Sequence, residues 1–224
     1  MRKLVLFDID GTLVRRAGPH HREALCVGIH RVTGIRTTTD GIPVQGMLDP
    51  DILTEMLKRE GVKAAQIREL LPEIQRRAEN YYLKVCPPLD DKHCPAVEEV
   101  LKRLARRRIL LGLVTGNLTK IGWRKLHRAG LRYYFCFGAF GEMAKTRGGL
   151  VKIAVRHARN EGWIERDAPI SLIGDAPQDI IAARENGIRA ISVKTGITPV
   201  EELEAQRPDV LLRDLRELRL RMVE

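Results

Sequence analysis

The sequence lacks the features of a secreted or membrane-embedded protein. Its four cysteines form no C-x-x-C pair and outline no disulfide framework, and its six histidines are too scattered to suggest a zinc site. No apolar run is long enough to cross a bilayer. The first apolar run is interrupted by Asp8 and Asp10, unlike the core of a signal peptide. We therefore expect a cytoplasmic protein with no membrane partner.

Aromatic residues are also few, at 4% of the chain, and this limits what its positive charge can mean. The 39 Lys and Arg residues against 29 Asp and Glu give a formal charge of +10, which by itself would favour a nucleic-acid ligand. Aromatic and basic residues do not alternate, however, so no base-stacking platform is predicted. We expect the basic residues to lie on solvent-facing helix surfaces and to attract an anionic substrate. They cluster as Lys102, Arg103, Arg106, Arg107 and Arg108 in one helix and as Arg213, Arg216, Arg219 and Arg221 in another.

The opening stretch combines a buried strand with two acidic residues. Leu4–Phe7 is a run of four apolar residues, typical of a parallel strand covered on both faces. Asp8 and Asp10 follow at its carboxyl end, two apart, so their side chains point the same way. Gly11 then permits a tight turn. Two convergent carboxylates there suit a hard cation with oxygen ligands.

A helical segment interrupts the sheet pattern after this strand. Between Val14 and Ile109 the apolar spacing is helical, with a helix before Gly34, one that begins with Asp49 as N-cap and Pro50 next, and one over 64–83 that Pro72 kinks or splits. At 224 residues the chain can bury one core and a small second one. We expect an all-helical unit over 16–91 inserted into a core of 1–15 and 92–224.

The core is predicted to be α/β, a doubly wound parallel Rossmann-like sheet. Apolar strands alternate with helical segments from Val97 onward, a spacing that implies right-handed crossovers. The predicted strands are 109–114, 134–137, 170–173, 190–193 and 210–212. Polar residues end two more of them: Thr115, Gly116 and Asn117 follow one strand, and Asp175 and Asp179 follow another. Such ends converge on one crevice with Asp8 and Asp10.

The segment Phe7-Asp8-Ile9-Asp10-Gly11-Thr12-Leu13 resembles the first motif of haloacid dehalogenase-like hydrolases, in their phosphatase branch. The strand-end residues that follow in the same order extend this resemblance over essentially the whole chain. It implies a helical cap over 16–91 that closes over the site and selects the substrate. It also implies a magnesium-dependent phosphatase that acts on a small phosphorylated metabolite.

Within that resemblance, phosphate-ester chemistry gives each residue a role. Asp8 is the expected nucleophile, forming an aspartyl-phosphate. Asp10 would protonate the leaving alcohol and then activate water, a role that needs its pKa raised by neighbouring carboxylates. Asp8, the Asp10 carbonyl and Asp175 would hold Mg²⁺, while Asp179 would either ligate it or orient a water.

Phosphate binding is assigned to Thr115-Gly116-Asn117, here called the second motif, and to one cation. The Thr115 hydroxyl and the N–H groups of Gly116 and Asn117 would bind phosphate oxygens. Family members usually carry a Lys, often before Pro, at a later position; here the segment holds Lys145 and Arg147. Either fits, and we favour Arg147 because its distance from Leu150 and Val151 resembles that in a subgroup of the family that uses Arg there.

Cap residues are the expected determinants of the substrate. His20, His21 and Arg22 follow the first motif closely enough to reach an anionic or hydroxyl group of the substrate. The segment 46–50 resembles a cap loop of phosphoglycolate phosphatase-like members, although Met47 and Leu48 replace a more polar pair. Phosphoglycolate is the best single substrate prediction.

The sequence is also compatible with other functions. A phosphomutase or phosphotransferase of the same family would differ by shielding its aspartyl-phosphate from water. A phospho-acceptor signalling domain would not need a cap, and a non-enzymatic nucleic-acid-binding protein on this fold would show salt-dependent DNA binding. The protein is expected to be a monomer or a homodimer.

Overall fold

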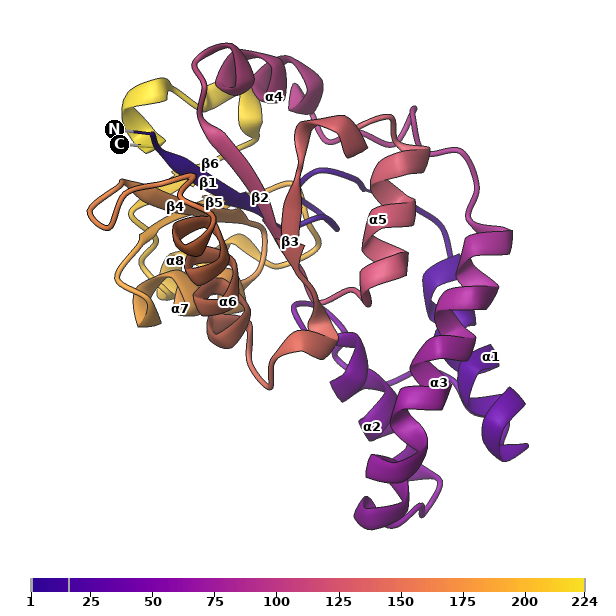
Figure 1. Ribbon diagram of the computed structural model, residues 1–224. Coiled ribbons are helices and arrows are strands. Elements are labelled where there is room, and N and C mark those ends of the chain that lie inside the picture. Colours follow the sequence, from indigo (N-terminus) through magenta and orange to yellow (C-terminus); the bar gives the residue numbers. More distant parts are fainter. Residues whose placement is uncertain (1, 16, 224) are drawn as a thin grey trace.

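The computed structural model describes residues 2–15 and 17–223 and contains a parallel sheet of six strands in the order β3-β2-β1-β4-β5-β6 (Figure 1). Leu4–Phe7 (β1) lies at its centre, paired with β2 on one side and β4 on the other. The other strands are Leu110–Val114 (β2), Phe137–Ala139 (β3), Ile170–Gly174 (β4), Arg189–Val193 (β5) and Val210–Leu212 (β6). The predicted doubly wound fold is confirmed.

Helices cover both faces of this sheet, since alternate residues of β1 enter two separate apolar cores. Val5 and Phe7 pack in the core that includes Val97–Arg106 (α4) and Thr119–Arg128 (α5). Leu4 and Leu6 pack in the core that includes helices of the other face. Those helices are Arg147–Asn160 (α6), Pro177–Glu185 (α7) and Val200–Ala205 (α8).

Three further helices form a group beside the sheet (Figure 1). They are His20–Thr33 (α1), Asp49–Arg59 (α2) and Ala64–Val85 (α3). Their apolar faces join the core of α4 and α5. Helix α1 ends at Gly34, as predicted, and Gly34 has the left-handed conformation. Helix α3 runs through Pro72 without a break. The division into a cap of 16–91 and a core remains a prediction, and residue 16 lies outside the described residues.

Some local predictions are wrong. The strand expected at 134–137 is instead a 3₁₀ turn at Arg132–Tyr134 (η1) followed by β3, because Phe135 turns inward to meet Phe7 edge-to-face at 6.0 Å. The basic segment 213–221 is no single helix: it contains two 3₁₀ turns, Leu215–Glu217 (η3) and Leu220–Val223 (η4), separated by an extended Leu218. A further 3₁₀ turn, Gly141–Met143 (η2), precedes α6.

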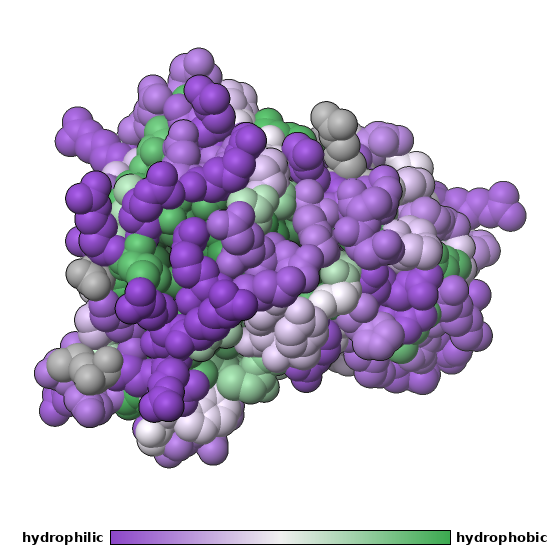
Figure 2. Space-filling model, turned by 90° about the horizontal axis from the view of Figure 1, so that it is seen from above, coloured by the Kyte–Doolittle hydropathy of each residue, from purple (hydrophilic) through white to green (hydrophobic). Residues whose placement is uncertain are grey.

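The surface agrees with the prediction that charged residues lie on solvent-facing helix surfaces. The face in Figure 2 is mainly hydrophilic, with apolar surface in separate patches. Lys102 and Arg106 of α4 are exposed, as predicted. Within the described residues, no helix combines the length and apolar character that a bilayer-spanning segment requires.

Gly28 allows α1 and α3 to approach closely. A Cβ at this position would lie 2.8 Å from the Ile74 carbonyl oxygen and 2.9 Å from the Ala78 Cβ. Gly→Ala within a helix normally stabilises it by about 1 kcal/mol. We expect Gly28→Ala to lower the free energy of unfolding by about 1–2 kcal/mol instead, because overpacking outweighs helix propensity. Denaturant unfolding measures this, with exposed Lys58→Ala as the near-neutral control. A Gly28→Ala protein as stable as the parent would contradict the packing argument.

Candidate active site

Three buried carboxylates meet at the carboxyl ends of neighbouring strands. Asp8 directly follows β1, Asp175 directly follows β4, and Asp179 lies in the first turn of α7. One carboxylate oxygen from each lies within 4.8 Å of the others. Thr12 donates to Asp175 Oδ1 at 3.1 Å and fixes that side chain. Parallel strand pairing thus brings together residues more than 160 positions apart in the chain.

Arg147 is the cation that the structure brings to this acidic cluster. Its Nη1 lies 3.3 Å from Asp8 Oδ1 and 3.1 Å from Asp179 Oδ1, and its side chain is 6% exposed. A cavity at this end of the sheet is lined by Asp8, Asp10 and Arg147, among others. Lys145, the other candidate, is exposed on the segment before α6 and does not line this cavity. The sequence favoured Arg147 without excluding Lys145, and burial separates the two residues.

The acidic cluster still carries more negative charge than Arg147 balances. Burial, together with Asp8 and Asp179, raises the pKa of Asp175. Burial also raises the pKa of Asp179 to about 7, although Arg147 opposes the shift. The Oδ1 atoms of Asp8 and Asp179 are buried, and both face the single guanidinium of Arg147. Buried carboxylate oxygens of this kind suit a divalent cation, which Asp8, Asp175 and Asp179 would hold.

Asp10 faces away from this cluster and toward α5. Asn117 Nδ2 donates to Asp10 Oδ2 at 2.7 Å and to the Thr115 hydroxyl oxygen at 2.8 Å. Thr115 is fully buried, whereas Gly116 and Asn117 line the cavity. The structure therefore places the second motif beside Asp10, as the converging strand ends predicted.

Lys125 of α5 contacts Asp10, and the sequence analysis missed it. Its Nζ donates to both Asp10 carboxylate oxygens, at 2.7 and 2.6 Å, and to Asn117 Oδ1 at 2.6 Å. Burial alone would raise the pKa of Asp10, but Lys125, His21 and Asn117 together outweigh burial, and the pKa of Asp10 is lowered. The expected upward shift is wrong, because Asp10 pairs with a lysine rather than with the neighbouring carboxylates. A signal was available: Lys125 falls on the same helix face as buried Ile121.

A chain of polar contacts extends from Lys125 into the helical group. Lys125 Nζ lies 3.0 Å from His21 Nδ1; an ammonium only donates, so Nδ1 accepts and Nε2 carries the proton. His21 Nε2 donates to Asp49 Oδ2 at 2.9 Å, and that oxygen also accepts from the Leu118 N–H at 2.8 Å. Asp49 is thus not the N-cap of α2, a position that Leu48 takes.

Of the other two candidate cap residues, one lines the cavity and one does not. His20 does not line the cavity, and its buried Nδ1 has no hydrogen-bond partner among the described residues. Arg22 lines the cavity, and its side chain is also exposed to solvent. The structure therefore brings His21 and Arg22 to the site but not His20.

The loop before α2 closes the cavity from the side of the helical group. The cavity has a volume of about 200 Å³. Gln45 Nε2 donates to Asp175 Oδ2 at 2.7 Å, a contact that no sequence pattern announced because Gln45 lies in an irregular loop. The Met47 carbonyl packs on Gly116, where a Cβ would come within 2.3 Å of it. Only glycine fits there.

Comparisons with known proteins agree with this geometry. The family model for haloacid dehalogenase-like hydrolases matches residues 2–187. A phosphoglycolate phosphatase of Synechococcus elongatus is 30% identical over 158 residues, covering 70% of this chain and 69% of that protein. One from Agrobacterium fabrum is 29% identical over 223 residues, covering 94% and 88%. The solved structure of a beta-phosphoglucomutase from Clostridium difficile superposes with a TM-score of 0.72 at 17% identity, covering 100% of this chain and 96% of that one.

The chain belongs to the haloacid dehalogenase-like hydrolases. Among them it is a phosphatase, as the family model and the phosphatase relatives indicate. The likeness to the phosphoglucomutase concerns the fold alone.

Removing Arg147 should have effects that removing Lys145 does not. Arg147→Met leaves the three buried carboxylates without their cation, and we expect it to lower the free energy of unfolding by about 3 kcal/mol in metal-free buffer. Lys145→Met removes an exposed charge and should change stability by less than about 0.5 kcal/mol. Denaturant unfolding of both variants makes the comparison. Equal effects of the two substitutions would contradict the assignment of the buried cation.

Proposed function

We propose that the chain is a magnesium-dependent phosphatase that hydrolyses a small phosphomonoester through an aspartyl-phosphate on Asp8. The convergence of Asp8, Asp175, Asp179 and Arg147 at one end of the sheet carries the proposal. A phosphomonoester brings about two negative charges, so attack by a carboxylate requires charge neutralisation and an in-line approach. The carboxylates and Arg147 of this cluster would supply the charge neutralisation, and Asp8 would supply the attacking carboxylate.

The metal ligands in this proposal are Asp8, the Asp10 carbonyl and Asp175, with Asp179 as a fourth ligand or as the partner of a bound water. Bound Mg²⁺ would offset the charge of the phosphate and of the carboxylates. The raised pKa values of Asp175 and Asp179 support a further cation at this point, since among the described residues Arg147 alone faces the buried oxygens of Asp8 and Asp179.

The phosphate group would be held by the second motif and by Arg147. The Thr115 hydroxyl oxygen accepts from Asn117, which leaves its proton free to donate to a phosphate oxygen. The N–H groups of Gly116 and Asn117 precede α5 and would donate as well. Arg147, already beside Asp8, would neutralise charge on the transferred phosphoryl group.

Proton transfer is assigned to Asp10 together with Lys125. The Asp8 carboxylate attacks phosphorus and the bond to the leaving oxygen breaks; a proton from the Asp10–Lys125 pair then completes the alcohol. In the second step Asp10 takes a proton from water, which attacks the aspartyl-phosphate and releases phosphate and the Asp8 carboxylate. The Asp10 side chain is 44% exposed toward the cavity, which suits contact with a substrate.

The substrate is proposed to be small, with phosphoglycolate as the best candidate. A cavity of about 200 Å³ leaves room for little beyond a phosphate and a short organic acid. Arg22 and His21 line it and would meet a second anionic group. The names of two relatives support this choice. The helices of 16–91 would act as the cap that excludes water.

Replacing the nucleophile should abolish turnover. We expect Asp8→Asn to reduce phosphate release from p-nitrophenyl phosphate and from phosphoglycolate at least about 10³-fold, since the amide cannot attack phosphorus. Chelation of divalent metal should likewise stop the parent protein, and added Mg²⁺ should restore it. An Asp8→Asn protein that keeps substantial, metal-dependent activity would contradict the proposal.

Lys125 should matter most when the leaving group needs a proton. We expect Lys125→Met to lower kcat on an alkyl phosphate by about 10²-fold and on p-nitrophenyl phosphate by much less, because p-nitrophenolate leaves without protonation. Lys120→Met is the matched control, since Lys120 lies on the same helix but pairs with Glu79 at its surface. Equal losses of Lys125→Met on both substrates would reduce Lys125 to a structural role.

A further inference from the structure

A second cavity lies at the amino-terminal edge of the sheet, opposite the candidate active site. It has a volume of about 800 Å³ and is lined by residues at the starts of β1 and β2, at the end of α4 and in η4. The central strands are 4 and 5 residues long, so roughly 15 Å separate it from the carboxylates. Its volume falls within the range of roughly 300–1,000 Å³ that small-molecule sites occupy.

The charge of this cavity is of one sign. Arg2, Lys3, Arg107 and Arg108 line it, and none of the lining residues that the structure describes is acidic. Within residues 2–15 and 17–223, no carboxylate lies within ion-pair distance of Arg107 or Arg108. Several of the other basic residues pair with acids, as Lys102 does with Glu98. Part of the positive charge that lies outside the candidate active site is therefore concentrated around this cavity.

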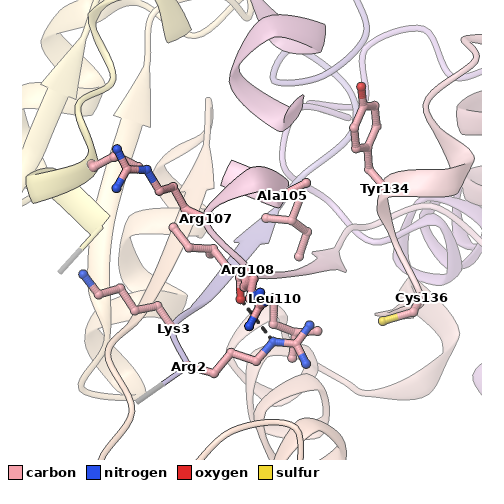
Figure 3. Close-up of a pocket in the computed structure, with 11 residues that line it drawn as sticks. Arg2, Lys3, Ala105, Arg107, Arg108, Leu110, Tyr134 and Cys136 are labelled. Atoms are coloured by element: carbon pink, nitrogen blue, oxygen red, sulfur yellow. Dashed lines mark hydrogen bonds between the residues drawn. The ribbon is translucent and has the colours of Figure 1, made fainter. Parts of the chain in front are cut away.

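Two of these basic residues are held by the backbone. Arg108 has a φ of 56°, in the left-handed region that favours glycine, and turns the chain from α4 into β2. Its carbonyl accepts a hydrogen bond from Arg2 Nε at 3.2 Å. The two side chains lie next to each other at the cavity (Figure 3). The Arg2 side chain is thus fixed against the Arg108 backbone before any ligand binds.

The opposite wall is apolar and aromatic. In Figure 3 the basic side chains lie on one side, Tyr134 and Cys136 lie on the other, and Leu110 lies between them. The other apolar residues that line the cavity are Ala105, Ile109, Leu111 and Leu220. A ligand that fits both walls carries several negative charges at one end and a flat or apolar group at the other.

We propose that this cavity binds an organic polyphosphate of nucleotide size. The phosphates would contact Arg2, Arg107 and Arg108, for which multiply charged oxyanions are the best match. The organic ring would lie toward Tyr134 and Leu110. The site is distinct in place and size from the phosphatase cavity, and the proposal does not depend on that activity.

The test is titration calorimetry of the full chain with ATP, in chelator so that no turnover occurs. Arg107→Gln/Arg108→Gln removes two cations from the cavity. Lys152→Gln/Arg156→Gln removes two exposed cations from α6 and serves as the matched control. We expect the parent and the control to bind ATP alike, and the cavity variant to bind at least about tenfold more weakly.

Inorganic tripolyphosphate and a short DNA duplex complete the experiment. Weaker binding of tripolyphosphate than of ATP would support the contribution of the organic ring. Equal affinity for the two would overturn that part of the proposal. The site would be overturned if ATP does not bind, or if Arg107→Gln/Arg108→Gln leaves ATP binding unchanged. It would also be overturned if the protein binds the duplex but not ATP, and the same two substitutions weaken binding of the duplex.

Discussion

The mutual repulsion of three buried carboxylates is the constraint on which the candidate active site depends. Asp8, Asp175 and Asp179 converge because β1 and β4 are neighbours in a parallel sheet, and burial makes their charges costly. Arg147 offsets one charge, and the remainder favours a divalent cation. The geometry that strains the metal-free site is thus the geometry that would bind metal and phosphate.

A second set of contacts links this site to the helical group. Lys125 is buried and contacts Asp10, Asn117 and His21. His21 continues the chain to Asp49, which accepts from a core N–H directly after the second motif. Because a buried ammonium must direct its three protons to acceptors, the placement of Asp10 and the packing of α1 and α2 against the core are linked through Lys125. Movement of α1 would remove one acceptor from Lys125.

Much of this arrangement was predictable from local sequence. The strands of the core are apolar runs, and the polar residues that follow β1, β2 and β4 indicated one crevice. The sequence did not separate Lys145 from Arg147, because the difference between them is burial, which depends on how α6 packs. Lys125 was missed because its partners lie on other elements, although its position on an apolar helix face was visible.

Irregular segments were the least predictable. Gln45 reaches Asp175 from a loop whose path depends on the close fit of Met47 on Gly116. The strand near residue 135 was misplaced because Phe135 is buried by an aromatic contact with Phe7 rather than by strand pairing. These features depend on tertiary contacts that local periodicity does not encode.

Chemical trapping of the phosphorylated enzyme tests the central claim most directly. Acid quenching during turnover, reduction with borohydride and mass spectrometry of the peptides would locate an acyl phosphate, since reduction converts phosphorylated aspartate to homoserine. The account predicts homoserine at position 8 and nowhere else, dependent on substrate and divalent metal. An unmodified Asp8 during rapid turnover, or a phosphoryl group trapped on another residue, would contradict it.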